Sequence, residues 1–113
     1  IIWHQGEADA NSKGIPVYAN RLDSLFGMFR KTCKNKNLPI VMGELGYFSK
    51  TSHESFMQIH GIMHEHTTKD LFTAVVKTED LDHKGDFLHF NAAGQRMLGA
   101  RYAEAFATRW PLR

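Results

Sequence analysis

The sequence predicts an α/β fold in which helices cover a parallel β-sheet. Three short apolar runs, at residues 1–3, 38–42 and 71–76, alternate with three longer segments whose apolar side chains recur at helical spacing. This alternation is typical of parallel strands that are connected through helices. The 113 residues, with 42% hydrophobic content and a formal net charge of +2, suit one globular domain or part of one.

The first strand and the first helix are separated by a polar loop. Residues 1–3 have the β-branched and aromatic composition of a buried strand end. Residues 4–14 form the loop, and Pro16 can occupy the first position of a helix that extends to about Cys33. The apolar residues at helical spacing in this segment are Tyr18, Leu22, Leu25, Phe26 and Phe29.

The remaining elements repeat the pattern. Residues 38–42 form a second strand, and Thr51 or Ser52 can cap a second helix, which carries Phe56, Ile59, Ile62 and Met63. Residues 71–76 form a third strand, which is followed by a long polar loop. Asn91 is the expected cap of the last helix. We expect its apolar stripe to consist of Ala93, Met97, Leu98, Tyr102, Ala105 and Phe106.

The distribution of charge argues against a nucleic-acid-binding protein. The densest basic segment runs from Arg30 to Lys36 and contains no interleaved aromatic residues. It lies where the first helix ends, and cations interact favourably with the helix dipole there, so we interpret it as a solvated helix end. Cys33 is the single cysteine, which excludes an internal disulfide. No apolar stretch approaches the roughly 18 residues that suggest a membrane span, so we expect neither a nucleic-acid nor a membrane partner.

Two loops that follow predicted strands carry most of the reactive side chains. The first comprises residues 4–9, and the second comprises residues 80–89. The carboxyl ends of parallel strands share one edge of a sheet, where α/β proteins place their ligands. We therefore expect the two loops to meet at one edge.

Asp86 and His89 are the strongest catalytic candidates in the second loop. A spacing of three lets the carboxylate reach the imidazole Nδ1–H, which leaves Nε2 free as a base. The alternative is a surface Asp and His near the start of a helix, where an anion is favourable in any case. The spacing alone leaves both interpretations open.

Gln5, Gly6 and Glu7 are the candidates in the first loop. A glutamine amide can donate a hydrogen bond to a developing oxyanion, and Glu7 is a second carboxylate that could support an imidazolium. The alternative is a polar turn in which Gly6 supplies a positive φ. The residue types alone favour the turn.

A metal site is the competing interpretation of the seven histidines. His60 and His64 are spaced i, i+4 on one predicted helix, a spacing that can hold zinc. The His-Glu-x-x-His motif is absent, however, and a third ligand is not evident. Asp82, His83, Asp86 and His89 form a second, weaker set. We expect the two helical histidines to be solvated and not to bind a metal.

The motifs resemble those of SGNH-type esterases. Residues 3–9, Trp-His-Gln-Gly-Glu-Ala-Asp, resemble the Trp-x-Gln-Gly-Glu-(Ser/Ala)-Asp block of this group. The narrower resemblance is to sialate O-acetylesterase-like proteins and acetylxylan esterases. Residues 86–90 resemble the group's Asp-x-x-His block, and residues 91–103 resemble the helix that follows it.

The resemblance implies a three-layer α/β/α, flavodoxin-like SGNH hydrolase fold, with residues 1–113 as the C-terminal half of a single domain. It also implies a serine esterase without metal or other cofactor. His89 would be the general base, and Asp86 or Glu7 would be its acidic partner. Gln5 and Gly6 would belong to the oxyanion and substrate-binding site. The substrate would be an O-acetylated carbohydrate: acetylated xylan, a related polysaccharide or sialic acid.

The group's nucleophile block, Gly-(Asp/Gln)-Ser-(Asn/Leu), is absent from the sequence. We therefore expect the serine on a companion N-terminal segment or chain. An uncovered sheet edge with residues such as Ile1, Ile2, Val41 and Val75 would also need a partner. The polymeric substrates of the group favour an extracellular or periplasmic location. The alternatives are an inactive carbohydrate-binding or interaction module of the same fold and a metal-dependent hydrolase.

Overall fold

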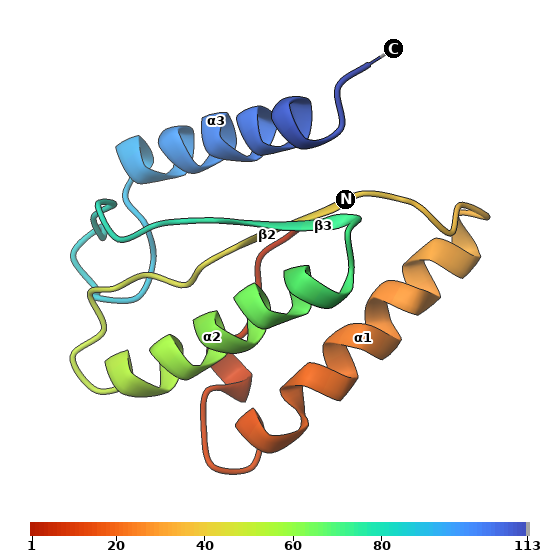
Figure 1. Cartoon of the computed structure of the whole chain (residues 1–113). Helices are drawn as coiled ribbons and strands as arrows, with labels where there is room; N and C mark the ends of the chain where they lie inside the picture. The colour runs from red at the N-terminus through yellow and green to blue at the C-terminus, as the bar shows by residue number, and fades with distance from the viewer. Residues whose placement is uncertain (113) are drawn as a thin grey trace.

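The computed structural model, which describes residues 1–112, has three layers (Figure 1). The parallel sheet has the order β1-β2-β3. Its strands are β1 (Ile2–Trp3), β2 (Ile40–Gly43) and β3 (Thr73–Val76). The helices are α1 (Ile15–Thr32), α2 (His53–Lys69) and α3 (Ala92–Arg109), with a short 3-10 helix η1 (Glu7–Asp9). Figure 1 shows α1 and α2 on one face of the sheet and α3 on the other, which confirms the predicted α/β/α architecture.

The strands are shorter than their apolar runs. β2 begins at Ile40 because Pro39 has no N–H to donate to a neighbouring strand, and the Ile40 N–H donates to Phe72 O at 2.9 Å. β2 then pairs with β3 from Ile40↔Thr73 to Gly43↔Val76 and with β1 through Ile2↔Val41. All four residues of β2 are buried, as expected for a central strand with helices on both faces.

The larger core lies between the sheet and the two helices on one face. Apolar side chains of α1 and α2 meet there with Trp3 of β1 and two side chains of β2, as the helical spacing predicts. The buried members are Tyr18, Leu22, Phe26, Ile40, Met42, Leu45, Phe56, Ile59 and Met63.

The smaller core lies under α3, and it corrects the predicted stripe of that helix. Gly94, Leu98 and Tyr102 are buried, whereas Ala93, Met97 and Phe106 are exposed. Positions 94, 98 and 102 follow one helix face at intervals of four, whereas Ala93 and Met97 each lie one position, or about 100°, away from this face. Phe106 continues the same interval, but it lies in the last turn of α3, where it is exposed. The helix begins as expected, because Asn91 Oδ1 accepts the Gly94 N–H at 2.7 Å.

β1 forms an open edge of the sheet. The side chain of Ile2 is 63% exposed. Beside this strand, a groove of about 490 Å³ runs along α1 and is lined by Trp3, Val17, Leu25 and Met28 among others. Val41, in contrast, is buried in the central strand. None of the helices among residues 1–112 has the length and apolar character needed to cross a membrane.

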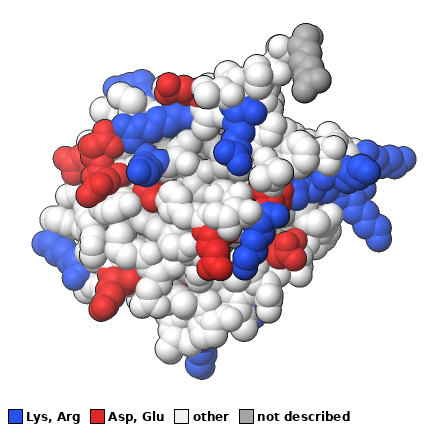
Figure 2. Space-filling model, viewed as in Figure 1, with Lys and Arg blue, Asp and Glu red and all other residues white. Residues whose placement is uncertain are grey.

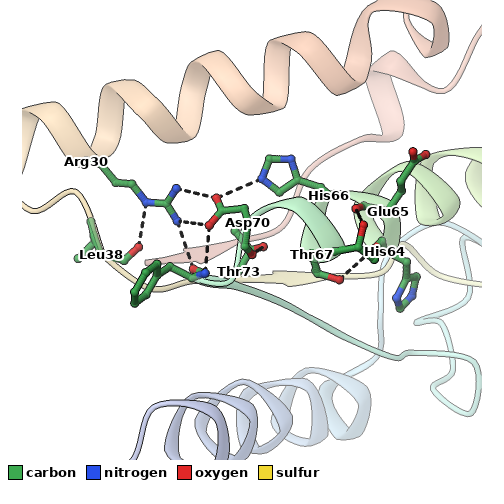
Figure 3. A network of polar contacts seen from close by, with 10 residues as sticks. Arg30, Leu38, His64, Glu65, His66, Thr67, Asp70 and Thr73 are labelled. Atoms are coloured by element: carbon green, nitrogen blue, oxygen red, sulfur yellow. Dashed lines mark hydrogen bonds and ion pairs between the residues drawn. The ribbon is translucent and has the colours of Figure 1, made fainter.

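The amino end of the sheet is held by a polar network around Arg30 and Asp70 (Figure 3). The Arg30 guanidinium donates to both Asp70 oxygens, at 2.6 and 3.3 Å, and to the carbonyl oxygens of Leu38 and Phe72. Arg30 is therefore not part of a solvated helix end, although Lys31, Lys34 and Lys36 are exposed as expected. Figure 2 shows positive charge gathered where α1 ends and negative charge over the loop between β3 and α3.

Candidate active site at the carboxyl edge of the sheet

The predicted meeting of two loops occurs at the carboxyl edge of the sheet. The loops after β1 and β3 leave the sheet at Trp3 and Val76, on the same side because the strands are parallel. The His4 ring lies 5.6 Å, centroid to centroid, from the ring of Phe90, which directly follows His89 in the sequence. His4 thus brings the first predicted motif into contact with the second.

Asp86 and His89 form a hydrogen-bonded pair. Asp86 Oδ2 lies 2.5 Å from His89 Nδ1. Asp86 Oδ1 accepts the backbone N–H groups of Leu88 and His89 at 3.0 and 2.9 Å, which fixes the carboxylate. The hydrogen bonds from His89 to this carboxylate hold the pKa of Asp86 far below its usual value. The ionised carboxylate therefore orients the imidazole, and the side chain of His89, 62% exposed, leaves Nε2 accessible.

The turn that carries this pair is supported by His83. His83 Nδ1 accepts the backbone N–H groups of Gly85 and Phe87 at 3.0 and 3.1 Å, and its ring stacks 4.0 Å from that of Phe87. Gly85 and Phe87 both adopt positive φ values, of 114° and 57°, which bend the chain sharply around Asp86. His83 therefore stabilises the conformation of the loop, and its Nδ1 already accepts two hydrogen bonds.

Gln5 and Glu7 lie at the same edge, but within residues 1–112 neither makes a hydrogen bond to His89. Gln5 Nε2 donates to Asp9 Oδ2 at 2.7 Å, and both side chains line the groove between β1 and α1. The amide retains one free N–H and its carbonyl oxygen. Glu7 is exposed at the start of η1, so the carboxylate in contact with His89 is that of Asp86.

Gly6 is needed for two reasons. Its φ of 150° is rarely adopted by residues with a side chain. A Cβ at this position would also lie 2.9 Å from Ile59 Cγ2. The Tyr18 hydroxyl donates to Gln5 O at 3.0 Å and fixes the turn from the α1 side. The predicted positive-φ turn is therefore present, and it presents Gln5 and Glu7 at the sheet edge.

Sequence reasoning missed Glu44, which directly follows β2 between the two loops. Its side chain is only 3% exposed. Oε1 accepts the Tyr47 hydroxyl at 2.9 Å and the Thr78 N–H at 3.2 Å, while Oε2 lies 2.7 Å from His64 Nε2. A lone glutamate after an apolar run gives no signal of burial, because two of its three partners, His64 and Thr78, lie 20 and 34 residues away in the sequence.

His60 and His64 of α2 contradict the expectation that both are solvated. His60 is 4% exposed, and its Nδ1 lies 4.0 Å from Glu44 Oε2. Burial, together with the nearby His64, lowers the pKa of His60, although Glu44 opposes the shift. His64 is half-exposed and bonds to Glu44. In the part of the chain that the structure describes, no three His, Cys, Asp or Glu side chains are grouped as metal ligands.

Comparison with a solved structure supports the fold. An X-ray structure of a protein from Arabidopsis thaliana aligns with a TM-score of 0.79 at 24% identity, covering 95% of this chain and 43% of that protein. The chain therefore spans less than half the length of this structural neighbour. Comparison with curated proteins gave no significant match.

A family model agrees with the motifs at the sheet edge. The model described as carbohydrate esterase, sialic acid-specific acetylesterase, matches residues 1–108, which include both loops and the Asp86–His89 pair. The chain therefore belongs to this family of carbohydrate esterases.

Proposed function

We propose that this chain provides the histidine and aspartate of a serine esterase site that removes O-acetyl groups from carbohydrate. The observation that carries the proposal is the hydrogen bond between Asp86 Oδ2 and His89 Nδ1, in a chain of a carbohydrate esterase family. An oriented imidazole with an accessible Nε2 is the base that a serine hydroxyl needs to become a nucleophile.

The proposed reaction has two acyl-transfer steps. The serine Oγ attacks the acetyl carbonyl carbon while His89 Nε2 takes its proton, and His89 then returns that proton to the departing sugar oxygen. In the second step, water attacks the acetyl carbon of the acetyl-serine while His89 Nε2 takes a proton from the water. The bond from the acetyl carbon to the serine Oγ breaks, His89 returns the proton to Oγ, and acetate leaves. Asp86 stabilises the imidazolium that forms in each step.

Gln5 is proposed to stabilise the oxyanion. Its Nε2 has one N–H left after bonding to Asp9, and one such donor contributes about 3 kcal/mol to transition-state stabilisation. Gly6 permits this turn and thereby presents the amide. Glu7 lies at the same edge and is proposed to contact the substrate or the site.

We propose that a companion segment supplies the serine nucleophile. The groove beside β1 supports this, since it exposes apolar side chains along the open edge of this strand and its lining includes Gln5 and Asp9. A strand added to β1 would bring its own carboxyl-end loop next to Gln5. O-acetylated xylan, another polysaccharide and O-acetyl sialic acid are the candidate substrates, and we favour an extracellular or periplasmic site of action.

The test is His89→Ala in protein that contains both this chain and the serine-bearing segment. We expect hydrolysis of 4-nitrophenyl acetate and of acetylated xylan or O-acetyl sialic acid to fall by about 10³-fold or more, because the serine loses its base. His53→Ala, which removes an exposed histidine of α2, is the matched control and should retain activity.

Two further measurements separate the proposal from its alternatives. A fluorophosphonate serine probe should label the wild-type protein, and a chelator should leave its activity unchanged. Near wild-type turnover by His89→Ala would refute the role of His89. Sugar binding without labelling would favour an inactive binding module, and loss of activity to the chelator would favour a metal-dependent hydrolase.

A further inference from the structure

We propose that Glu44 is a positioning residue that holds the loops after β1 and β3 in fixed relation to each other. The inference rests on the proposed function in one respect, namely that these loops carry the groups of the esterase site. Among the described residues, no hydrogen bond or ion pair joins Glu44 to Gln5 or His89. Its effect on the reaction would come from the separation of the two loops.

The side chain of Glu44 links β2 to the loop after β3. Its carboxylate accepts the Thr78 N–H at 3.2 Å, and Thr78 is the second residue after β3. The Thr78 hydroxyl in turn donates to Leu45 O at 2.7 Å, and Thr78 is fully buried. Two hydrogen bonds therefore fix the start of the loop that leads to Asp86 and His89.

The backbone of the same residue links β2 to the loop after β1. His4 Nε2 donates to Glu44 O at 3.2 Å, and His4 is the residue directly before Gln5. Through its carboxylate and its carbonyl, Glu44 thus holds both site loops from the central strand. The His4 ring also packs against Phe90, so the two loops contact each other directly.

The groups around the carboxylate hold it in its charged form. His60 and His64 face it from α2, Tyr47 from its own loop, and Thr78 from the loop after β3. Burial by itself raises the pKa of Glu44, but the hydrogen bonds from His64 and Tyr47, with the nearby His60, outweigh burial and lower it. The carboxylate is therefore charged and fully engaged at neutral pH.

A buried carboxylate of this kind is a weak source of net stability, because the cost of its desolvation offsets the gain from its hydrogen bonds. Its hydrogen bonds are directional, however, and they join elements that are far apart in the sequence. The main consequence of Glu44 is therefore geometric. A shift of about 1 Å between catalytic groups can reduce a rate by about 10²-fold.

The experiment compares Glu44→Gln with Glu65→Gln, which changes an exposed glutamate on α2 in the same way. Glutamine keeps the size of the side chain and one acceptor oxygen, but it removes the charge and the acceptor opposite His64. The uncharged amide holds the Thr78 N–H less strongly, so we expect amide hydrogen exchange to become about tenfold faster in residues 77–91 of Glu44→Gln, with α1 unchanged. Residues 4–9, which the Glu44 backbone carbonyl holds through His4, should change less. In the esterase assay, kcat should fall about tenfold or more while KM changes little.

The hydrogen-exchange measurement and the esterase assay test the positioning role and the proposed function separately. If the wild-type protein hydrolyses no acetyl ester, the proposed function is wrong, whereas the exchange measurement still tests the positioning role. Unchanged exchange in residues 77–91 of Glu44→Gln would overturn the inference, and so would equally faster exchange throughout the chain, including α1. If Glu44→Gln does not fold, Tyr47→Phe removes one hydrogen bond to the same carboxylate and should give a smaller change in residues 77–91.

Discussion

The two ends of the sheet use ionic pairs in different ways. At the amino end, the side chains of Arg30 and Asp70 are 15% and 17% exposed. The guanidinium donates four hydrogen bonds, two to Asp70 and one each to the carbonyl oxygens of Leu38 and Phe72 (Figure 3). At the carboxyl end, the side chains of Asp86 and His89 are 36% and 62% exposed, and within residues 1–112 the His89 ring forms a hydrogen bond through Nδ1 alone. The first pair is enclosed by the fold, whereas the second presents a free atom at the surface.

This difference indicates what each pair contributes. A partly buried bidentate pair with further bonds to backbone carbonyls ties α1 to the starts of two strands, so its contribution is to stability. An exposed pair contributes little to stability, because water screens its attraction. The value of the Asp86–His89 pair therefore lies in the orientation of the imidazole. We therefore expect changes at Asp86–His89 to affect catalysis and changes at Arg30–Asp70 to affect stability.

The largest effect is expected for Asp86→Asn. Loss of the carboxylate removes the acceptor that selects the His89 tautomer, so the rate of acetyl-ester hydrolysis should fall by about 10²- to 10⁴-fold. The melting temperature should change little, since the pair is exposed. Kinetics with 4-nitrophenyl acetate and thermal denaturation measure the two effects.

Glu7→Gln is the control for this prediction, because Glu7 is the other carboxylate that the sequence offers as a partner of His89. It should reduce the rate far less than Asp86→Asn. A larger loss in Glu7→Gln would transfer the acidic role to Glu7 and would indicate that the loops rearrange in the complete site.

A smaller effect, and on stability alone, is expected for Arg30→Met. The substitution leaves Asp70 partly buried without its main partner, which should cost about 2 kcal/mol of unfolding free energy. Activity per folded molecule should be unchanged, because the pair lies at the opposite end of the sheet. Urea denaturation measures the loss, with Lys31→Met, at the next, exposed position, as the control. Equal stability of the two variants would contradict the proposed role of the network.

The same comparison explains what the sequence could predict. The alternation of apolar runs and helical stripes predicted all three strands and helices, because the period of burial is a local property of each segment. The Asp86–His89 contact was also predictable, since its partners are three residues apart. Glu44, His60 and Arg30 were not, because each is buried by partners on other elements, and neither composition nor local spacing encodes those contacts.

The spacing of apolar residues also predicted the buried face of α3 only in part. Met97 is apolar and belongs to the predicted stripe, yet it is exposed, because the buried face of α3 runs through Gly94, Leu98 and Tyr102, one position away. A Cβ at Gly94 would lie 3.3 Å from the Phe90 side chain and 3.3 Å from the Asp82 carbonyl oxygen, so this position packs closely against the loop before α3. Counting apolar residues does not detect a glycine that is buried by such close packing.

The smallest expected effect is on the pH dependence of folding stability, and it concerns the buried His60. Because burial and His64 lower the pKa of His60 against the opposing charge of Glu44, the folded protein binds a proton there at lower pH than the unfolded chain, whose histidine has the ordinary value of 6.5. Below that value, the unfolded state takes up the proton first, so folding stability should fall with acidification. One proton limits the slope that His60 contributes to about 1.4 kcal/mol per pH unit.

His60→Gln should remove this contribution, so its unfolding free energy should decline less steeply than that of the wild type between about pH 7.5 and about pH 5.5. Urea denaturation across this range measures the slopes, and His53→Gln, which changes an exposed histidine of the same helix, should keep the wild-type slope. Parallel slopes for wild type and His60→Gln would mean that His60 gains its proton equally in both states. That result would contradict the interpretation that the burial of His60 outweighs the nearby Glu44 charge and disfavours its protonation in the folded protein.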